Sequence, residues 1–272
     1  DPIGHSKSPQ MHNPALRARG IDAQYIRVQV PVGRVKEAFA HFRQHGFLGV
    51  NITIPHKFEA LDAVDEVDPL ARRLGAVNTL AIRDGRMFGY NTDGPGFLAS
   101  VKEGFGIEVA GLRVLVLGAG GGAGRAVAVQ CALAGARVIL ANRTQAKAEQ
   151  VRAEIAAMSP AFPAEIAPEV SAEAVAAADM IVNATPLGMK GADMPLIPPG
   201  SLQARHLVYD MVYRADGDAP QIAAARASGA RWIDGLNMLL HQGAISFEHW
   251  FGPPAPLDAM RAGLLGAVAE RT

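Results

Sequence analysis

The residues best suited to chemistry are Lys57 and Asp93, each in a polar cluster at the end of a predicted element. A lysine close to a pocket of low polarity can exchange a proton near neutral pH, and a neighbouring carboxylate can hold it in position. The alternative is structural, with Lys57 as a solvated helix residue and Asp93 as the N-cap of the helix after Gly94. The residues alone leave both interpretations open.

Three polar clusters, at residues 5–9, 51–57 and 89–94, combine hydroxyl, amide and charged side chains. This composition is typical of a pocket for a polyhydroxylated carboxylic acid. The clusters do not have the composition of a metal site, and the single cysteine excludes a cysteine-based zinc cluster. We therefore expect a site without a metal ion.

A glycine-rich run follows a predicted strand and opens a predicted helix. Gly118, Gly120 and Ala123 match the G-x-G-x-x-A fingerprint of dinucleotide-binding βαβ units. The first glycine allows a tight turn, the second lets the backbone approach a pyrophosphate, and the helix N-terminus supplies free N–H groups. A flexible connector or a tight helix-packing contact is the alternative. The expected cofactor loop comprises Gly118, Ala119, Gly120, Gly121, Gly122 and Ala123.

The triplet Asn142-Arg143-Thr144 follows the next predicted strand, 24 residues after Gly118. An acidic residue near this point binds the ribose hydroxyl of NAD, whereas an arginine can accept the 2′-phosphate of NADP. Lys147 adds a second cation one helical turn further on. The predicted cofactor is therefore NADP, with an ordinary surface arginine as the alternative interpretation of Arg143.

The composition limits the class of protein. The 272 residues include 26 basic and 26 acidic side chains, so we expect no binding to nucleic acid or to an anionic membrane. Cys131 is the single cysteine, which excludes an internal disulfide framework and fits a reducing cytoplasm. The longest apolar stretch, residues 114–141, is interrupted by glycines and polar side chains, so no transmembrane helix is expected. The expected partner is a small molecule.

The pattern of strands and helices predicts an α/β protein with two domains. In the first region we expect a helix at residues 34–45, another beginning at Pro55, and a turn at Asp84-Gly85. A helix is expected after Gly94. The strands expected in this region are 24–30, 48–52, 76–82 and 86–90.

The second region alternates strands with helices, which predicts a parallel sheet covered on both faces. Its expected helices are 121–135 and 145–156, and residues 190–200 are expected to form a loop. The expected strands are 113–117, 137–141, 180–183, 206–210 and 231–233.

Two further helices are expected from about Met238 to Arg271, interrupted at residues 252–254 and packing back on the first region. The predicted domains are a substrate-binding and catalytic domain, residues 1–93 with 238–272, and a Rossmann-like NADP-binding domain, residues 94–237.

Together these motifs resemble the shikimate dehydrogenase family over essentially the whole chain. The resemblance implies a cytoplasmic, NADP-dependent oxidoreductase of aromatic amino acid biosynthesis, monomeric or homodimeric, that interconverts 3-dehydroshikimate and shikimate by hydride transfer at C3. The matching segments are I-G-H-S-K-S-P-Q-M-H-N (3–13), G-V-N-I-T-I-P-H-K (49–57), G-A-V-N-T (75–79), G-Y-N-T-D (89–93), the glycine loop, 142–144, 183–189 and D-G-L-N-M-L-L-H-Q (234–242).

The resemblance also implies roles for individual residues. It makes Lys57 and Asp93 the catalytic pair and places the substrate carboxylate at Ser6 and Ser8, with Tyr213 nearby. The residues expected to hydrogen-bond the ring hydroxyls are Asn51, Thr53, Asn78, Asp93 and Gln242. Besides the glycine loop, the residues expected to contact the cofactor are Asn142, Arg143, Thr144, Lys147, Thr185, Met211 and Gly235.

Two segments depart from the family pattern. Asn237 stands where a glycine is usual, and residues 214–217 replace a commoner Asn-Pro segment. An asparagine close to the nicotinamide and the ring could change which cyclitol fits, so quinate or an amino-substituted shikimate stays an alternative substrate. A non-catalytic nucleotide-sensing protein is the alternative from another class. Lys57 and Asp93 argue against it, and Arg143 argues against NAD-dependent quinate oxidation.

Overall fold

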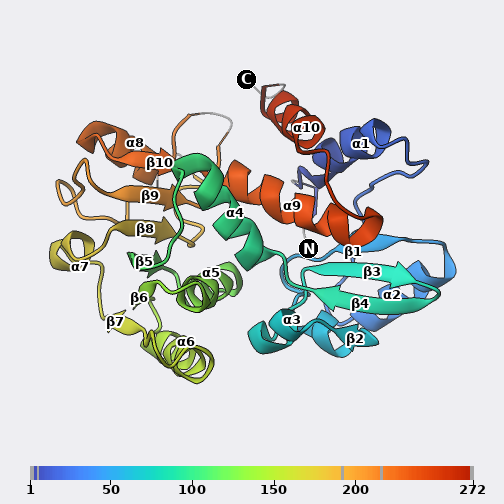
Figure 1. Cartoon of the computed structure of the whole chain (residues 1–272), viewed down its shortest axis with the longest axis horizontal. Helices are drawn as coiled ribbons and strands as arrows, with labels where there is room; N and C mark the ends of the chain where they lie inside the picture. Colours follow the sequence, from blue (N-terminus) through green and yellow to red (C-terminus); the bar gives the residue numbers. More distant parts are fainter. Residues whose placement is uncertain (1–2, 5, 191–192, 215–216, 270–272) are drawn as a thin grey trace. The chain divides into compact units, whose positions relative to one another are not determined.

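The computed structural model describes residues 3–4, 6–190, 193–214 and 217–269 (Figure 1). Its chain divides into two compact units. The first unit comprises the residues up to Pro95 and those from Leu240 onward, and the second runs from Gly96 to Leu239.

The first unit contains a four-stranded mixed sheet. Its strands are β1 (Gly49–Asn51), β2 (Glu66–Val67), β3 (Thr79–Arg83) and β4 (Arg86–Tyr90). They lie in the order β1-β3-β4-β2, with β3 antiparallel to both neighbours and β2 parallel to β4. Asp84 and Gly85 both have positive φ, which confirms the two-residue Asp-Gly turn between β3 and β4.

Helices complete the first unit. They are α1 (Ser8–Ala18), α2 (Val35–Gln44), the 3₁₀ helix η1 (Glu59–Asp62), α3 (Pro69–Leu74) and α10 (Leu257–Ala269). Phe39 and Phe42 of α2 are buried in one core with Val77 and Leu80. Burial of a side chain of this size contributes roughly 1.5–3 kcal/mol. α10 packs against α1, which confirms that the C-terminal helices return to the first unit.

The second unit is built on a six-stranded sheet. Its strands are β5 (Arg113–Leu117), β6 (Arg137–Ala141), β7 (Glu165–Ala167), β8 (Met180–Asn183), β9 (Leu207–Asp210) and β10 (Arg231–Ile233). The order β10-β9-β8-β5-β6-β7 is parallel throughout. Residues 114–117 of β5 are buried, as expected for a strand covered on both faces.

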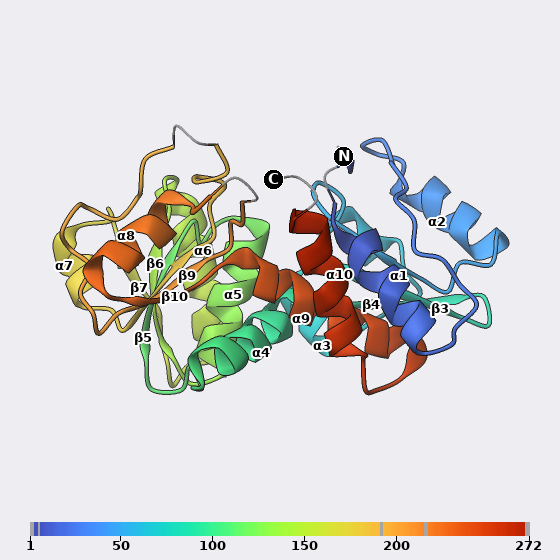
Figure 2. The same ribbon diagram turned by 90° about the horizontal axis from the view of Figure 1, so that it is seen from above.

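Helices cover both faces of this parallel sheet. Figure 2 shows α5 and α6 on one side and α7 and α8 on the other. They are α5 (Gly122–Leu133), α6 (Gln145–Met158), α7 (Ala172–Ala176) and α8 (Pro220–Ser228). The chain passes between the units inside α4 (Asp93–Phe105) and α9 (Gly235–Phe251). The predicted α/β class and the Rossmann-like sheet are confirmed.

The strand predicted at residues 24–30 is wrong. The side chain of Asn13 hydrogen-bonds both main-chain groups of Tyr25. It accepts from the N–H at 2.7 Å and donates to the carbonyl at 3.0 Å. His56 Nε2 donates to the carbonyl of Val30 at 2.8 Å. A cavity of about 470 Å³ is lined by residues 22–26 and 45–49, and among the described strands β1 pairs with β3 alone. Side chains therefore satisfy both main-chain groups of Tyr25 and the carbonyl of Val30, which a neighbouring strand could have paired.

The α-helix predicted to begin at Pro55 is also wrong. Residues 54–58 form turns, and only the short 3₁₀ helix η1 follows. The carbonyl of Lys57 accepts from Val77 N at 2.9 Å, and Leu61 N donates instead to Phe58 at 3.2 Å. The backbone group that would have continued an α-helix is thus used to join this turn to the segment before β3.

Five short elements were not predicted: β2, α3, β7, α7 and α8. Helix α3 carried a readable signal, because Asp68 caps its first turn through hydrogen bonds from Leu70 and Ala71, and Gly75 ends it in a left-handed conformation. Helix α9 begins at Gly235, three residues earlier than predicted.

Candidate active site

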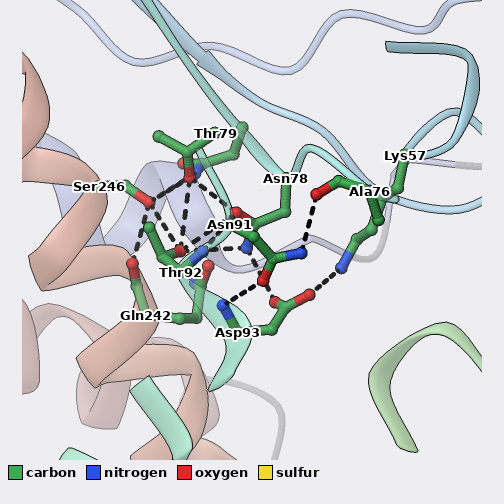
Figure 3. A network of polar contacts seen from close by, with 10 residues as sticks. Lys57, Ala76, Asn78, Thr79, Asn91, Thr92, Asp93, Gln242 and Ser246 are labelled. Carbon is green, nitrogen blue, oxygen red and sulfur yellow. Dashed lines mark hydrogen bonds and ion pairs between the residues drawn. The ribbon is translucent and has the colours of Figure 1, made fainter. Parts of the chain in front are cut away.

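The side chains of Lys57 and Asp93 form an ion pair in the first unit, with 2.7 Å between Lys57 Nζ and Asp93 Oδ2 (Figure 3). Both are largely buried, with side-chain exposures of 17% and 9%. The other carboxylate oxygen of Asp93 accepts from Asn78 Nδ2 at 2.8 Å. These partners replace the helix-capping role considered for Asp93, and they hold the ammonium group in one place.

Local structure fixes both members of the pair. The turn that carries Lys57 is joined to Val77 through its main-chain carbonyl. Asp93 is the first residue of α4, and its N–H donates to Asn91 Oδ1 at 3.1 Å. Asn91 Nδ2 donates in turn to the carbonyl of Ala76 at 3.0 Å. The segment before β3 therefore positions both catalytic candidates.

Asn78 lies at the centre of the polar network in Figure 3 and is only 2% exposed. Its amide nitrogen donates to Thr92 Oγ1 at 3.0 Å as well as to Asp93. Its side-chain oxygen, Oδ1, accepts from Thr92 N at 2.8 Å. Both N–H groups of Asn78 are used within the protein, so its role toward a ring hydroxyl stays a prediction.

Asn51 belongs to a second part of the same network. Its Nδ2 donates to Ser246 Oγ at 2.9 Å and to Thr79 Oγ1 at 3.2 Å, and its Oδ1 accepts from the Tyr25 hydroxyl at 2.9 Å. Ser246 and Thr79 are themselves 2.7 Å apart, and Ser246 Oγ donates to the carbonyl of Gln242 at 2.9 Å. α9 thereby joins the β1 and β3 ends of the site.

Ser6 and Ser8 lie together at the start of α1. Ser6 Oγ donates to Ser8 Oγ at 3.2 Å and accepts from Ser8 N at 3.3 Å. Lys7 between them is buried and donates to the carbonyl of Ala267 at 2.6 Å, which links the start of α1 to α10. Thr53 is exposed at the turn after β1. The predicted roles of Thr53, Gln242 and Tyr213 toward substrate stay predictions.

The glycine loop of the second unit forms the expected tight turn. Gly118 has φ of +80°, and Gly121 N donates to its carbonyl at 3.0 Å. Gly121 is the N-cap of α5 and has no side-chain cap, so the first N–H groups of this helix are available to an anion. A side chain at Gly124 would collide with the carbonyl of Gly118. Gly124 thus provides a close helix approach, and the role of Ala123 as the third small position stays a prediction.

The side chain of Asn142, just after β6, links the glycine loop to the residues that follow this strand. Its Oδ1 accepts from Gly120 N at 3.1 Å, and its Nδ2 donates to the carbonyl of Thr144 at 2.8 Å. A side chain at Gly120 would meet Lys147. Arg143 and Lys147 are exposed, and no ion pair joins either to another described residue. Two cations therefore stand beside the loop, which fits a nucleotide with an additional phosphate.

Thr185 is used to shape its own loop. Its hydroxyl donates to Asn183 Oδ1 at 2.7 Å and accepts from Leu187 N at 3.2 Å. Asn183 Nδ2 donates to Asp210 Oδ1 at 2.8 Å. Asp210 is fully buried, and burial raises its pKa to about 6. The ends of β8 and β9 are thereby linked.

Met211 and Gly235 lie in contact, because a side chain at Gly235 would collide with the backbone of Met211. Asn237 follows in α9, and its amide nitrogen approaches Gly104 of α4. Residues 214 and 217 are described, whereas the departures at 215 and 216 lie outside the described residues.

Sequence reasoning missed Tyr25, Thr79, Thr92 and Ser246 as members of the polar network. Thr79 and Thr92 stand next to predicted residues in the motifs, which is a usable signal, whereas Tyr25 and Ser246 carry none. Within the part of the chain that the structure describes, no group of three or more His, Cys, Asp or Glu side chains could hold a metal ion. The described helices include none long and apolar enough to span a membrane.

Three protein-family models match the chain. One described as "Shikimate dehydrogenase substrate binding domain" matches residues 1–80, and one described as "Shikimate 5'-dehydrogenase C-terminal domain" matches residues 235–265. A third, described as "short chain dehydrogenase", matches residues 113–185.

Full-length relatives agree with these matches. A shikimate dehydrogenase (NADP(+)) of Symbiobacterium thermophilum is 46% identical over 98% of this chain and 92% of its own length. Shikimate 5-dehydrogenase of Thermus thermophilus, solved with NADP(H) and shikimate, is 35% identical with a TM-score of 0.87, covering 98% of this chain and 96% of its own. Quinate dehydrogenase of Corynebacterium glutamicum, solved with NAD, is 30% identical with a TM-score of 0.87, covering 97% of this chain and 95% of its own.

Proposed function

The chain belongs to the shikimate dehydrogenase family, and we propose that it catalyses the NADP-dependent, reversible reduction of 3-dehydroshikimate to shikimate. The observation that carries the proposal is the largely buried Lys57–Asp93 pair, 2.7 Å apart, set among amides and hydroxyls. A binding module would have no chemical need for such a pair. The first unit takes the substrate in this proposal, and the second takes NADP.

Lys57 is the proton donor in the proposed reaction. During reduction its ammonium group gives a proton to the C3 oxygen as the carbonyl becomes an alcohol, and in oxidation its amine takes the proton back. Asp93 holds the ammonium group in position at 2.7 Å, and Asn78 holds Asp93 at 2.8 Å. A positioned acid or base of this kind contributes about 10²- to 10⁴-fold in rate.

The other substrate contacts follow the resemblance. Ser6 and Ser8 receive the carboxylate, assisted by Tyr213. The residues that contact the ring hydroxyls are Asn51, Thr53, Asn78, Asp93 and Gln242. Because the carboxylate is remote from C3, the serines act similarly in the ground and transition states and lower KM more than they raise kcat.

The cofactor, when bound, would supply the hydride as NADPH for reduction and would accept it as NADP⁺ in oxidation. The residues present fit this cofactor, because the uncapped N-terminus of α5 suits the pyrophosphate and Arg143 and Lys147 suit the 2′-phosphate. Asn142 and Thr185 support the cofactor site by fixing the loops around Gly120 and Leu187. Thr144, Met211 and Gly235 complete the proposed cofactor contacts.

The second candidate function is the oxidation of quinate with NAD, since a related quinate dehydrogenase is 30% identical. Arg143 disfavours it, because a cation at this position suits the 2′-phosphate that NAD lacks. An amino-substituted shikimate is a further candidate substrate. The proposal includes a cytoplasmic location, which the unpaired and buried Cys131 fits, and a monomer or homodimer.

Steady-state assays of shikimate and quinate oxidation, each with NADP and with NAD, test the proposal. We expect the highest kcat/KM for shikimate with NADP. A higher value for quinate or for NAD would support the second candidate, and nucleotide binding without turnover of any cyclitol would support a sensor.

A further inference from the structure

The hydroxyl of Tyr25 joins two parts of the site that have separate roles in the proposed function. It donates to Asn51 Oδ1 at 2.9 Å, and the side chain of Ser8 lies beside it. Ser6 Oγ donates to Ser8 Oγ at 3.2 Å. Tyr25 therefore stands between the serines proposed for the carboxylate and an amide proposed for the ring hydroxyls.

The donors along this series all point in one direction. A phenol has one proton, and Tyr25 gives it to Asn51, so the Tyr25 oxygen can only accept from the neighbouring Ser8 hydroxyl. Asn51 Nδ2 then donates to Ser246 Oγ at 2.9 Å and to Thr79 Oγ1 at 3.2 Å. Both the oxygen and the nitrogen of the Asn51 side-chain amide are thus hydrogen-bonded. Exchanging the two atoms would place the amide N–H groups opposite the hydroxyl proton of Tyr25.

The ring of Tyr25 is itself held firmly. It stacks on His12 with 4.5 Å between ring centroids and 15° between planes, and it lies 6.0 Å from Trp250. The Asn13 side chain binds both main-chain groups of Tyr25, at 2.7 and 3.0 Å. The hydroxyl is therefore presented on a rigid support although residues 24–30 form no strand.

We propose that Tyr25 is a positioning residue that couples carboxylate recognition at Ser8 to the orientation of Asn51. By fixing the Ser8 side chain and the Asn51 amide before substrate arrives, the hydroxyl reduces the ordering that binding would otherwise require. Selection for an acid group and selection for ring hydroxyls then depend on one network. The inference rests on the proposed function of these residues.

Tyr25→Phe tests the coupling because it keeps the stacked ring and removes only the hydroxyl. We expect KM for 3-dehydroshikimate to rise roughly 2- to 10-fold, the range for one lost hydrogen bond, with a smaller change in kcat. Tyr209→Phe is the matched control. The Tyr209 hydroxyl hydrogen-bonds Ser100 Oγ at 2.6 Å within the second unit, so this variant also loses one hydroxyl hydrogen bond, and we expect an unchanged KM.

The coupling itself is measured by introducing Ser8→Ala into three backgrounds: wild type, Tyr25→Phe and Tyr209→Phe. Ser8→Ala should raise KM by a smaller factor in the Tyr25→Phe background than in the other two. An equal factor in all three, or a wild-type KM for Tyr25→Phe, would overturn the inference while leaving the proposed function intact. A wild-type protein that does not turn over 3-dehydroshikimate would overturn both.

Discussion

Asp210 provides a test of the electrostatics at the ends of β8 and β9. Its Oδ1 accepts from Asn183 Nδ2 at 2.8 Å and from Val212 N at 3.0 Å. Its Oδ2 is buried and has no hydrogen-bond partner among the described residues. Burial raises the pKa of this carboxyl from 3.8 to about 6, although the hydrogen bonds from Val212 and Asn183 oppose the shift. The charged form is therefore the costly one.

The sign of the stability effect follows from this shift. Because the folded protein holds the proton more tightly than the unfolded chain, the stabilisation from Asp210 is complete below about pH 4 and is lost as pH rises through about 6. A shift of about two units corresponds to about 3 kcal/mol. Asp210→Asn keeps the accepting oxygen and cannot ionise. Its stability relative to wild type should therefore rise by up to about 3 kcal/mol between about pH 4 and pH 7.

Urea denaturation at a series of pH values measures this difference. Asp193→Asn is the control with the opposite sign, because the N–H groups of Gly188 and Lys190 lower the pKa of Asp193. That variant should lose stability relative to wild type as the pH rises. Parallel pH profiles for wild type and Asp210→Asn would refute the reasoning, since the buried carboxyl would then titrate as it does in the unfolded chain.

Three further predictions concern the second unit. Arg143→Ala should weaken NADP binding by roughly 1.5–3 kcal/mol more than NAD binding, as measured by titration calorimetry, and equal losses would remove the phosphate assignment. Gly124→Ala should destabilise the protein by about 1–3 kcal/mol because its side chain meets the Gly118 carbonyl, whereas Ala123→Gly should cost about 1 kcal/mol or less; the reverse ranking in urea denaturation would contradict the close approach at Gly124. Asn237→Gly should change the ratio of kcat/KM between shikimate and its analogues, and a uniform change would make Asn237 structural.

The pattern of apolar residues was sufficient to predict most strands of the second unit from the sequence. Strands β5, β6, β8 and β10 were predicted at the residues where the structure has them. Each is a short apolar or β-rich run beside a glycine, a turn or a helix start, and local pattern is sufficient there. Residues 24–30 are also a β-rich run, but no described strand pairs with them. The side chains of Asn13 and His56 hydrogen-bond their main chain instead.

The candidate site was predictable where motifs carry it and not where tertiary contacts do. Lys57 and Asp93 were identified together, and the structure joins them at 2.7 Å. Ser246 was missed because its role depends on α9 lying beside β1 and β3, a long-range contact with no local signature. Tyr25 was missed for the same reason, since its hydroxyl meets residues distant in sequence.

The most direct measurement of the central claim is the rate of 3-dehydroshikimate reduction by Lys57→Met, taken at saturating substrate and NADPH. Methionine keeps the apolar stem of lysine and removes the proton donor that faces Asp93. We predict that kcat falls by about 10²- to 10⁴-fold while NADP affinity stays nearly unchanged, because Lys57 belongs to the first unit. A kcat close to that of wild type, or a matching loss of NADP binding, would contradict the assignment of Lys57 as the proton donor.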